Sequence, residues 1–177
     1  MIKQFFVIAF MSLQVLGIAQ NLDVNMLRAI NKNEYPKWDK TMRFTSNTVY
    51  PALAIAPASL ILTGYINKDK AMMRNGVKTG LAIGFNALLT SGVKYTFKRK
   101  RPSVQYPDDI VKRTHSGIYS FPSGHTSNAF AMATALTLST KKWYVAGPSY
   151  LYAWGVGYSR MRLGVHFPSD VLGGMII

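Results

Sequence analysis

Four apolar segments separated by polar turns constrain the fold of this chain more than any other feature. They cover residues 49–66, 77–93, 129–138 and 143–158. Each is at or below the roughly 20 residues that a bilayer-spanning helix needs, and each contains small or polar residues. We therefore expect an all-α helical bundle with several short transmembrane helices. A soluble helical bundle is the alternative, because the mean hydropathy is only +0.08.

Basic residues dominate the charged ones. The 177 residues include 21 Lys and Arg against 7 Asp and Glu, a formal net charge of +14. Such an excess implies anionic partners, which are phosphate esters, nucleic acid or an anionic membrane surface. Nucleic acid is disfavoured because the basic residues adjoin apolar segments. The chain has no Cys, which excludes disulfides and thiolate metal sites.

The placement of the basic residues predicts which polar stretches lie together. Basic clusters occupy the turn between the first two apolar segments and the turn between the last two: Lys68, Lys70, Arg74 and Lys78, then Lys141 and Lys142. If both turns face the cytoplasm, the positive-inside rule is satisfied. Residues 94–127 and 159–170 then share the periplasmic or cell-exterior side. A soluble up-and-down bundle would bring the same two stretches together, so a shared site is expected either way.

The N-terminal part divides into two expected segments. Residues 1–19 fit a secretory signal peptide, with small residues before a cut after Ala19, although an uncleaved anchor helix is the alternative. Residues 20–46 have apolar positions close to helical spacing, which predicts an amphipathic segment that ends in a turn-like stretch at 31–40. Residues 47–177 form the main helical domain.

A basic run, "KYTFKRKR", opens the first polar stretch. Lys94 and Arg101 are seven positions apart, so they can share one face of a helix. An ammonium and a planar guanidinium aimed at one point suit a phosphoryl group. We expect Lys98, Arg99 and Lys100 to be a solvated charge run or an anchor for lipid headgroups.

The second polar stretch, "SFPSGHTS", predicts a turn that leads into a helix. The start of a helix exposes backbone N–H groups and is a ready anion site, here at Gly124. Ser123 could add its hydroxyl, and His125 would stand at the mouth of the site. A capping or hydrogen-bonded turn histidine is the alternative for His125.

The third stretch, "SRMRLGVHFPSD", places His166 four residues before Asp170. The pair could be metal ligands, a nucleophile with its orienting carboxylate, or a structural contact in which Asp170 caps a helix. A metal site is disfavoured because the three His and seven acids are scattered along the chain. A neutral imidazole attacks well when a carboxylate holds its other ring N–H. His125 could then protonate the leaving oxygen, with Arg160 among the cations around the phosphoryl group.

These stretches resemble the three-part signature of the type-2 phosphatidic acid phosphatase superfamily, which includes lipid phosphatases, bacterial acid phosphatases and vanadium haloperoxidases. All eleven signature positions are present in order and at the family's internal spacing: Lys94, Arg101 and Pro102; Pro122, Ser123, Gly124 and His125; and Ser159, Arg160, His166 and Asp170. The resemblance covers roughly residues 45–177. A chance match of this kind is very improbable.

The resemblance implies a helical bundle of the acid phosphatase/vanadium haloperoxidase type and a metal-independent phosphatase without a cofactor. His166 would become a phosphohistidine, Asp170 would assist it, and His125 would protonate the leaving group. The phosphate would be held by five residues: Lys94, Arg101, Ser123, Gly124 (through its N–H) and Arg160. The implied substrate is a lipid or small-molecule phosphomonoester or pyrophosphate, of the phosphatidate or undecaprenyl pyrophosphate type.

Two other functions remain open at this point. A vanadium-dependent haloperoxidase would use the same residues to hold vanadate, so vanadate should activate it but inhibit a phosphatase. A non-catalytic membrane protein that binds anionic lipid would show no turnover. One departure from the family concerns the last helix, since only about two turns follow Asp170. We therefore expect a short or truncated C-terminal helix.

Overall fold

A computed structural model of the chain describes residues 21–32 and 36–177, so the expected signal peptide lies outside the described residues. The described residues contain helices and no strand, which confirms the all-α prediction. Residues 21–30 are helical. The other helices are α2 (Pro36–Asn47), α3 (Val49–Ile66), α4 (Lys70–Phe97), α5 (Pro102–Gln105), α6 (Gly124–Thr140), α7 (Trp143–Arg162) and α8 (Pro168–Ile176).

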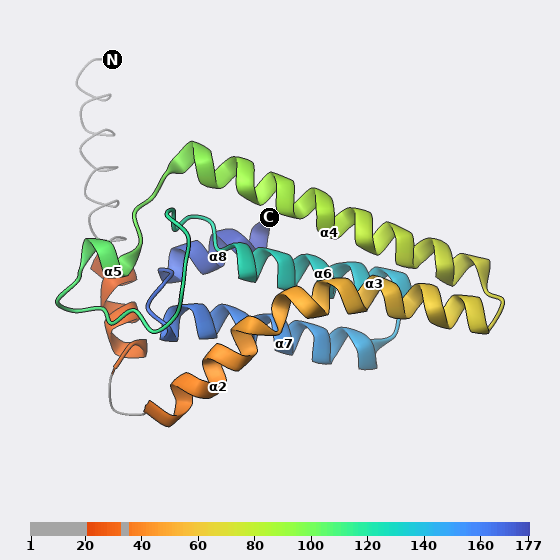
Figure 1. The fold of residues 1–177 in the computed structure, drawn as a ribbon, viewed down its shortest axis with the longest axis horizontal. Helices are drawn as coiled ribbons and strands as arrows, with labels where there is room; N and C mark the ends of the chain where they lie inside the picture. The colour runs from red at the N-terminus through yellow and green to blue at the C-terminus, as the bar shows by residue number, and fades with distance from the viewer. Residues whose placement is uncertain (1–20, 33–35) are drawn as a thin grey trace, which may run out of the picture.

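The four apolar segments each lie within one long helix, namely α3, α4, α6 and α7. In the bundle, α3 packs along α4, α4 along α6, and α6 along α7 (Figure 1). Small side chains allow the close approach of α6 and α7. The fully buried cluster between them and the start of α3 consists of Val49, Ala129, Ala133, Ala153 and Val156.

Polar side chains hold α4 against the first turns of α6. The Asn86 amide donates to the Ser127 hydroxyl over 2.9 Å and to Asn128 Oδ1 over 2.8 Å, and Thr90 and Ser127 share a hydrogen bond of 2.7 Å. All four side chains are buried. Buried polar groups that satisfy one another in this way specify register, so this cluster fixes the height of the α6 N-terminus beside α4.

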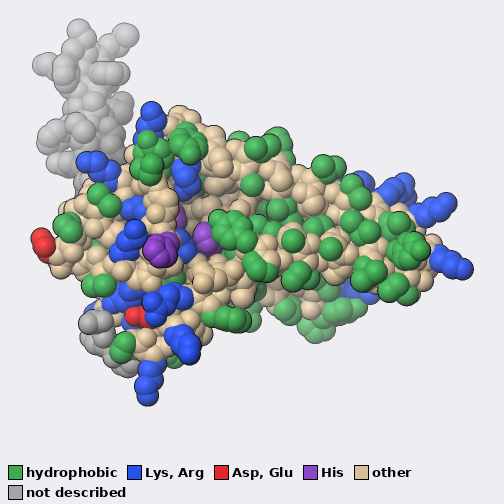
Figure 2. Space-filling model, viewed as in Figure 1, with side chains coloured by type: hydrophobic (Ala, Val, Ile, Leu, Met, Phe, Trp, Pro, Cys, Tyr) green, Lys and Arg blue, Asp and Glu red, His purple; other side chains and the backbone are tan. Residues whose placement is uncertain are grey.

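One described helix, α3, is long and apolar enough to cross a membrane. Many large apolar side chains of α3 and α4 face outward, among them Ile55, Leu62, Leu81, Phe85 and Leu88. Figure 2 shows these apolar surfaces along the bundle, with Lys and Arg side chains gathered at the two ends. An exposed apolar surface of this extent is typical of a membrane or protein contact.

The N-terminal segment packs into the bundle end rather than remaining apart from it. Leu27 is fully buried against Ile110 and Phe167. The turn-like prediction for 31–40 is wrong from Pro36 onward, because α2 begins there. Proline suits a first helical position, where a backbone N–H would have no partner.

Two side chains, Asp39 at the start of α2 and Asn31 just after the N-terminal helix, make buried polar contacts. Asp39 accepts from Arg113 Nε over 2.8 Å and from Arg162 Nε over 3.0 Å. The Asn31 side chain donates to the carbonyl of Arg162 over 2.8 Å and accepts from the N–H of Val111 over 2.8 Å. These contacts join the N-terminal segment to the end of α7 and to the connection between α5 and α6.

Candidate active site

A cavity of about 620 Å³ opens at the bundle end where α4 ends, α6 begins and α7 ends. Figure 2 shows histidine side chains among Lys and Arg side chains on this part of the surface. Six of the eight predicted site residues line the cavity: Lys94, Arg101, Gly124, His125, Arg160 and His166. The fold therefore unites the three polar stretches, as the alternation of apolar segments predicts.

The His166 ring has a defined polarity. Arg101 Nη1 lies 3.1 Å from His166 Nε2. A guanidinium can only donate, so Nε2 is the acceptor and carries the lone pair, and the ring proton belongs on Nδ1. Nδ1 faces Asp170 Oδ2 at 3.6 Å, which is longer than a hydrogen bond. This arrangement makes Nε2, which lies next to the cavity-lining Arg101, the atom that can act as a nucleophile.

Asp170 lies behind His166 and is fully buried. Its Oδ2 accepts from the N–H of Phe167 over 2.8 Å and from the Ser120 hydroxyl. The first of these bonds caps α8, so the capping role and the contact with His166 occur together. Burial alone would raise the pKa of Asp170, but His166, Arg99 and the Ser120 hydroxyl hold that pKa below its usual value. The carboxylate is therefore ionised and able to stabilise an imidazolium.

Arg99 is not the solvated charge that the sequence predicts. Its Nη1 donates to Asp170 Oδ1 over 2.7 Å, and its Nη2 donates to Asp23 Oδ2 over 2.7 Å. The expectation is wrong because nothing in a run of basic residues shows which one meets two buried carboxylates. Asp23 lies 76 positions from Arg99, and no local pattern connects the two.

Backbone carbonyls hold two of the cavity's cations. Arg101 donates from Nε to the carbonyl of Gly117 and from Nη1 to that of Val165, each over 2.6 Å. Lys94 Nζ donates to the carbonyl of Pro122 over 2.7 Å. Both cations are thereby oriented before any anion arrives, which is the arrangement that favours a transition state with developing negative charge.

Arg160 and His125 complete the charged wall of the cavity. Arg160 is buried, its Nη1 donates to the Ser46 hydroxyl over 2.5 Å, and its Nε has no hydrogen-bond partner among the described residues. The His125 ring packs edge-on against Tyr50, with centroids 5.0 Å apart. Burial, and then the cations of Arg160, Arg101 and Lys94, lower the pKa of His125 to about 3. An anion placed among these cations would counter that effect.

Of the two predicted phosphate-binding residues at the start of α6, Gly124 lines the cavity and Ser123 does not. Gly124 opens the helix and lines the cavity, so its backbone N–H is at an anion-binding helix start. Ser123 is fully buried and does not line the cavity, and its Oγ accepts from the Thr126 hydroxyl over 2.8 Å. A contact between Ser123 and a phosphoryl group stays a prediction. His115 is exposed and lies on the cavity wall.

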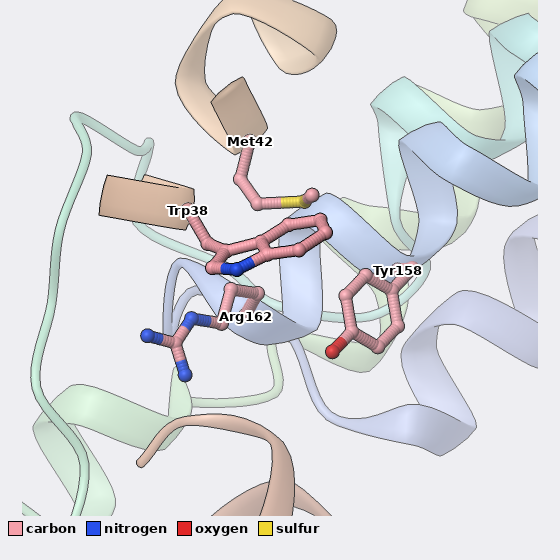
Figure 3. A pocket seen from close by; sticks show the side chains of 4 residues that line it. All are labelled: Trp38, Met42, Tyr158 and Arg162. Carbon is pink, nitrogen blue, oxygen red and sulfur yellow. The ribbon is translucent and has the colours of Figure 1, made fainter. Parts of the chain in front are cut away.

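A second, smaller cavity of about 380 Å³ lies beside α2 and α7 (Figure 3). Its walls are Trp38, Met42, Tyr158 and Arg162. The guanidinium of Arg162 is bound to Asp39 and donates to the carbonyls of residues 30 and 32. This cavity therefore offers mainly apolar and aromatic surface, whereas the candidate nucleophile His166 lines the larger cavity.

The comparison with family models decides the assignment. The model described as the PAP2 superfamily matches residues 75–177, which is more than half of the chain. The chain belongs to the PAP2 superfamily. The resemblance seen in the three motifs is thus confirmed, and the protein is a phosphatase of this type-2 phosphatidic acid phosphatase superfamily.

PAP2 relatives of known activity match most of the chain. A lipid A 4′-phosphatase from Bacteroides thetaiotaomicron is 27% identical over 166 residues, which cover 89% of this chain and 72% of the relative. The undecaprenyl-diphosphatase BcrC from Bacillus subtilis is 29% identical over 140 residues, covering 78% and 68%.

Solved PAP2 structures share the fold. A transmembrane PAP2-type phosphatidylglycerolphosphate phosphatase from Bacillus subtilis has a TM-score of 0.72 at 28% identity, covering 89% of this chain and 79% of its own. Aquifex aeolicus LpxE has a TM-score of 0.71 at 28% identity, covering 88% of each chain. The helical-bundle prediction is confirmed, and the outward apolar faces of α3 and α4 agree with a membrane location.

Proposed function

We propose that this PAP2 protein is a metal-independent phosphatase that hydrolyses a lipid phosphomonoester or diphosphate through a phosphohistidine at His166. The observation that carries the proposal is the polarity of the His166 ring. Its Nε2 lone pair lies next to the cavity-lining Arg101, while Nδ1 faces the buried carboxylate of Asp170. A neutral imidazole in this setting is an activated nucleophile.

In the first step, Nε2 attacks phosphorus, the N–P bond forms, and the bond from phosphorus to the leaving oxygen breaks. His125 gives its proton to that oxygen, which departs as an alcohol or, from a diphosphate, as a phosphomonoester. Asp170 stabilises the positive charge on the His166 ring. The cations of Lys94, Arg101 and Arg160 stabilise the phosphoryl oxygens, with positioning and charge supplying most of the rate.

In the second step, His125 takes a proton from water and the water oxygen attacks phosphorus. The N–P bond breaks, inorganic phosphate leaves, and His166 returns to its neutral form. His125 must be protonated in the first step although burial and three cations oppose this in the free enzyme. A bound phosphate dianion would offset these cations, so we infer that substrate binding charges His125.

The proposed substrate is a lipid because of the surroundings of the cavity and the relatives. The cavity wall includes Tyr50, Tyr95, Ile118 and Tyr119 beside its cations. The neighbouring helices α3 and α4 expose apolar side chains suited to a bilayer. The relatives act on lipid A, undecaprenyl diphosphate and phosphatidylglycerolphosphate, as their names state.

We further propose that the cavity faces the periplasm or the cell exterior. The α3–α4 and α6–α7 turns lie at the opposite end of the bundle. These turns and the first turns of α4 carry six basic residues: Lys68, Lys70, Arg74, Lys78, Lys141 and Lys142. The positive-inside rule favours a cytoplasmic position for such turns. The test is labelling of single introduced cysteines at Lys70 and Ile118 by a membrane-impermeant maleimide in intact spheroplasts, since the chain has no other Cys. Labelling at 118 but not at 70 is expected, and the reverse pattern would refute the orientation.

The decisive experiment measures phosphate release by detergent-purified protein in excess EDTA. Undecaprenyl diphosphate, phosphatidylglycerolphosphate, lipid A and a soluble aryl phosphate serve as substrates, with His166→Ala in parallel. Release that survives EDTA in the wild type and disappears in the variant supports the proposal, as does an acid-labile, base-stable phosphoryl label on the wild type. Equal release by both proteins would remove His166 as the nucleophile. Orthovanadate should inhibit release.

A further inference from the structure

Arg99 lies at the centre of a hydrogen-bonded cluster behind the proposed nucleophile. Its guanidinium donates to Asp170 Oδ1 over 2.7 Å, to Ser169 Oγ over 2.6 Å and to Asp23 Oδ2 over 2.7 Å. It also stacks over the Phe167 ring at 4.1 Å from the centroid. These contacts leave the Arg99 side chain 28% exposed, while Asp23 and Asp170 are 8% and 0% exposed.

Asp23 fixes the other side of the cluster. It accepts from the backbone N–H of Ser169 over 2.8 Å and from the Ser169 hydroxyl over 2.5 Å. The helix of residues 21–30 thus contacts both Arg99 and the residue that precedes Asp170. Asp23, Arg99 and Ser169 are not among the eleven signature positions, and neither Asp23 nor Arg99 lines the cavity.

We infer that Arg99 and Asp23 are a positioning pair that holds the Asp170 carboxylate for its work on His166. This inference rests on the proposed phosphohistidine mechanism. Arg99 occupies Oδ1 of Asp170, and this leaves Oδ2 as the oxygen that faces His166 Nδ1. Because Phe167 and Ser120 donate to Oδ2 from other directions, the carboxylate has one orientation.

Charge balance explains why the pair needs both members. An unpaired Arg99 cation beside Asp170 would partly neutralise the carboxylate. Asp170 would then stabilise the imidazolium that forms on His166 less strongly. Asp23 neutralises Arg99, so Asp170 keeps its full effect on the ring. Without Arg99, two buried carboxylates would share the cluster with no cation between them, and such groups repel strongly when they are removed from water.

The test compares variants of the pair with a matched control on the same helix. Arg28 joins that helix to Asp109 by an exposed ion pair that does not contact Asp170. Arg28→Ala should therefore leave turnover unchanged. Arg99→Ala and Asp23→Asn should lower kcat by roughly 10- to 100-fold, because losing a residue that orients a functional side chain has an effect of this size. KM should change by less than about threefold. Arg99→Lys should recover part of the loss.

The double variant Arg99→Ala/Asp23→Asn separates positioning from general packing. Residues that act as one unit give non-additive effects, so its kcat should fall by much less than the product of the single effects. Each rate is divided by the folded fraction of that variant, which thermal unfolding measures. If Arg99→Ala does not fold, Asp23→Asn still tests the pair, because it keeps the shape of the side chain. An active wild type whose pair variants match Arg28→Ala in kcat would refute the positioning pair and leave the phosphatase mechanism standing. A wild type that releases no phosphate would overturn both.

Discussion

Arg160 donates to the Ser46 hydroxyl over 2.5 Å from one nitrogen of its guanidinium, while its Nε has no partner among the described residues. A buried, unpaired N–H on a cation is costly in a folded protein unless a ligand satisfies it. Arg160 lines the large cavity, so its guanidinium lies where an anion would bind. Ser46 comes from α2, so the N-terminal part of the chain orients the side chain of Arg160.

Arg160→Lys should lower kcat/KM by roughly 10- to 100-fold, because an ammonium cannot keep the Ser46 contact and also present a second donor at a fixed angle. Ser46→Ala removes only the support and should cost less than tenfold. Steady-state phosphate release measures both effects. Similar kinetics for Arg160→Lys and the wild type would show that Arg160 acts only through its charge.

Asp170→Asn should reduce kcat by several orders of magnitude. An amide cannot stabilise the imidazolium with a full negative charge, and it also offers its NH₂ group to the wrong ring tautomer. Because the carboxylate also forms a largely buried ion pair with Arg99, the variant should lose thermal stability. Asp170→Glu keeps the charge and separates the two effects. If Asp170→Asn lost stability but kept its kcat, the carboxylate would have only a structural role.

The convergence of the three motifs was predictable from sequence, but the prediction that Lys94 and Arg101 share one helix face is wrong, because α4 ends at Phe97. The alternation of apolar segments places residues 94–127 and 159–170 at one end of a bundle, whatever the details of packing. His166 and Asp170 are four positions apart in sequence, and Lys94 lies in the last turn of α4, whose direction the apolar pattern sets. The cavity residues follow from these two facts.

The contacts of the N-terminal segment were not predictable in this way. Asp23 meets Arg99, Asp39 meets Arg162, and Ser46 meets Arg160 only after the chain has turned back over the bundle end. No periodicity relates an acidic residue in the first helix to a basic residue more than 70 positions away. Tertiary packing decides these pairs, so a single sequence shows neither which cation is buried nor which carboxylate it meets.

The stability of the fold should fall as the pH decreases from 6.5. Burial foremost, opposed by Asp170 and reinforced by Arg101 and Arg160, lowers the pKa of His166 from 6.5 to about 3. Between these values the unfolded chain binds a proton that the folded protein excludes, so the free energy of unfolding rises with pH across this window. The stability is fully present above pH 6.5 and is lost as the pH falls toward 3.

Thermal unfolding in detergent between pH 7.5 and pH 4.5 measures this effect. The His166→Gln variant lacks the titrating group, so its melting temperature should depend less on pH than that of the wild type. Parallel pH curves for the two proteins would contradict the burial of a neutral His166. The pH dependence of kcat/KM reports the pKa values of groups in the free enzyme. The same low pKa therefore predicts that kcat/KM falls on acidification only at a pH below the usual pKa of histidine.

Gly164→Ala should destabilise the turn that presents His166. Gly164 has φ of +71°, a conformation that costs an L-residue roughly 1–2 kcal/mol. An added Cβ would also lie 2.3 Å from the carbonyl oxygen of Val111, which is a backbone atom and cannot move away cheaply. We therefore expect a loss of more than about 2 kcal/mol in the free energy of unfolding, together with a lower kcat.

Gly84→Ala is the matched control for that substitution. Gly84 lies inside α4 and an added Cβ there meets nothing within 4 Å. Alanine favours a helix interior over glycine by about 0.5–1 kcal/mol, so this variant should be as stable as the wild type or more so. Urea unfolding followed by circular dichroism compares the two variants. A stable, fully active Gly164→Ala would mean that the turn before His166 adopts another backbone path than the one described.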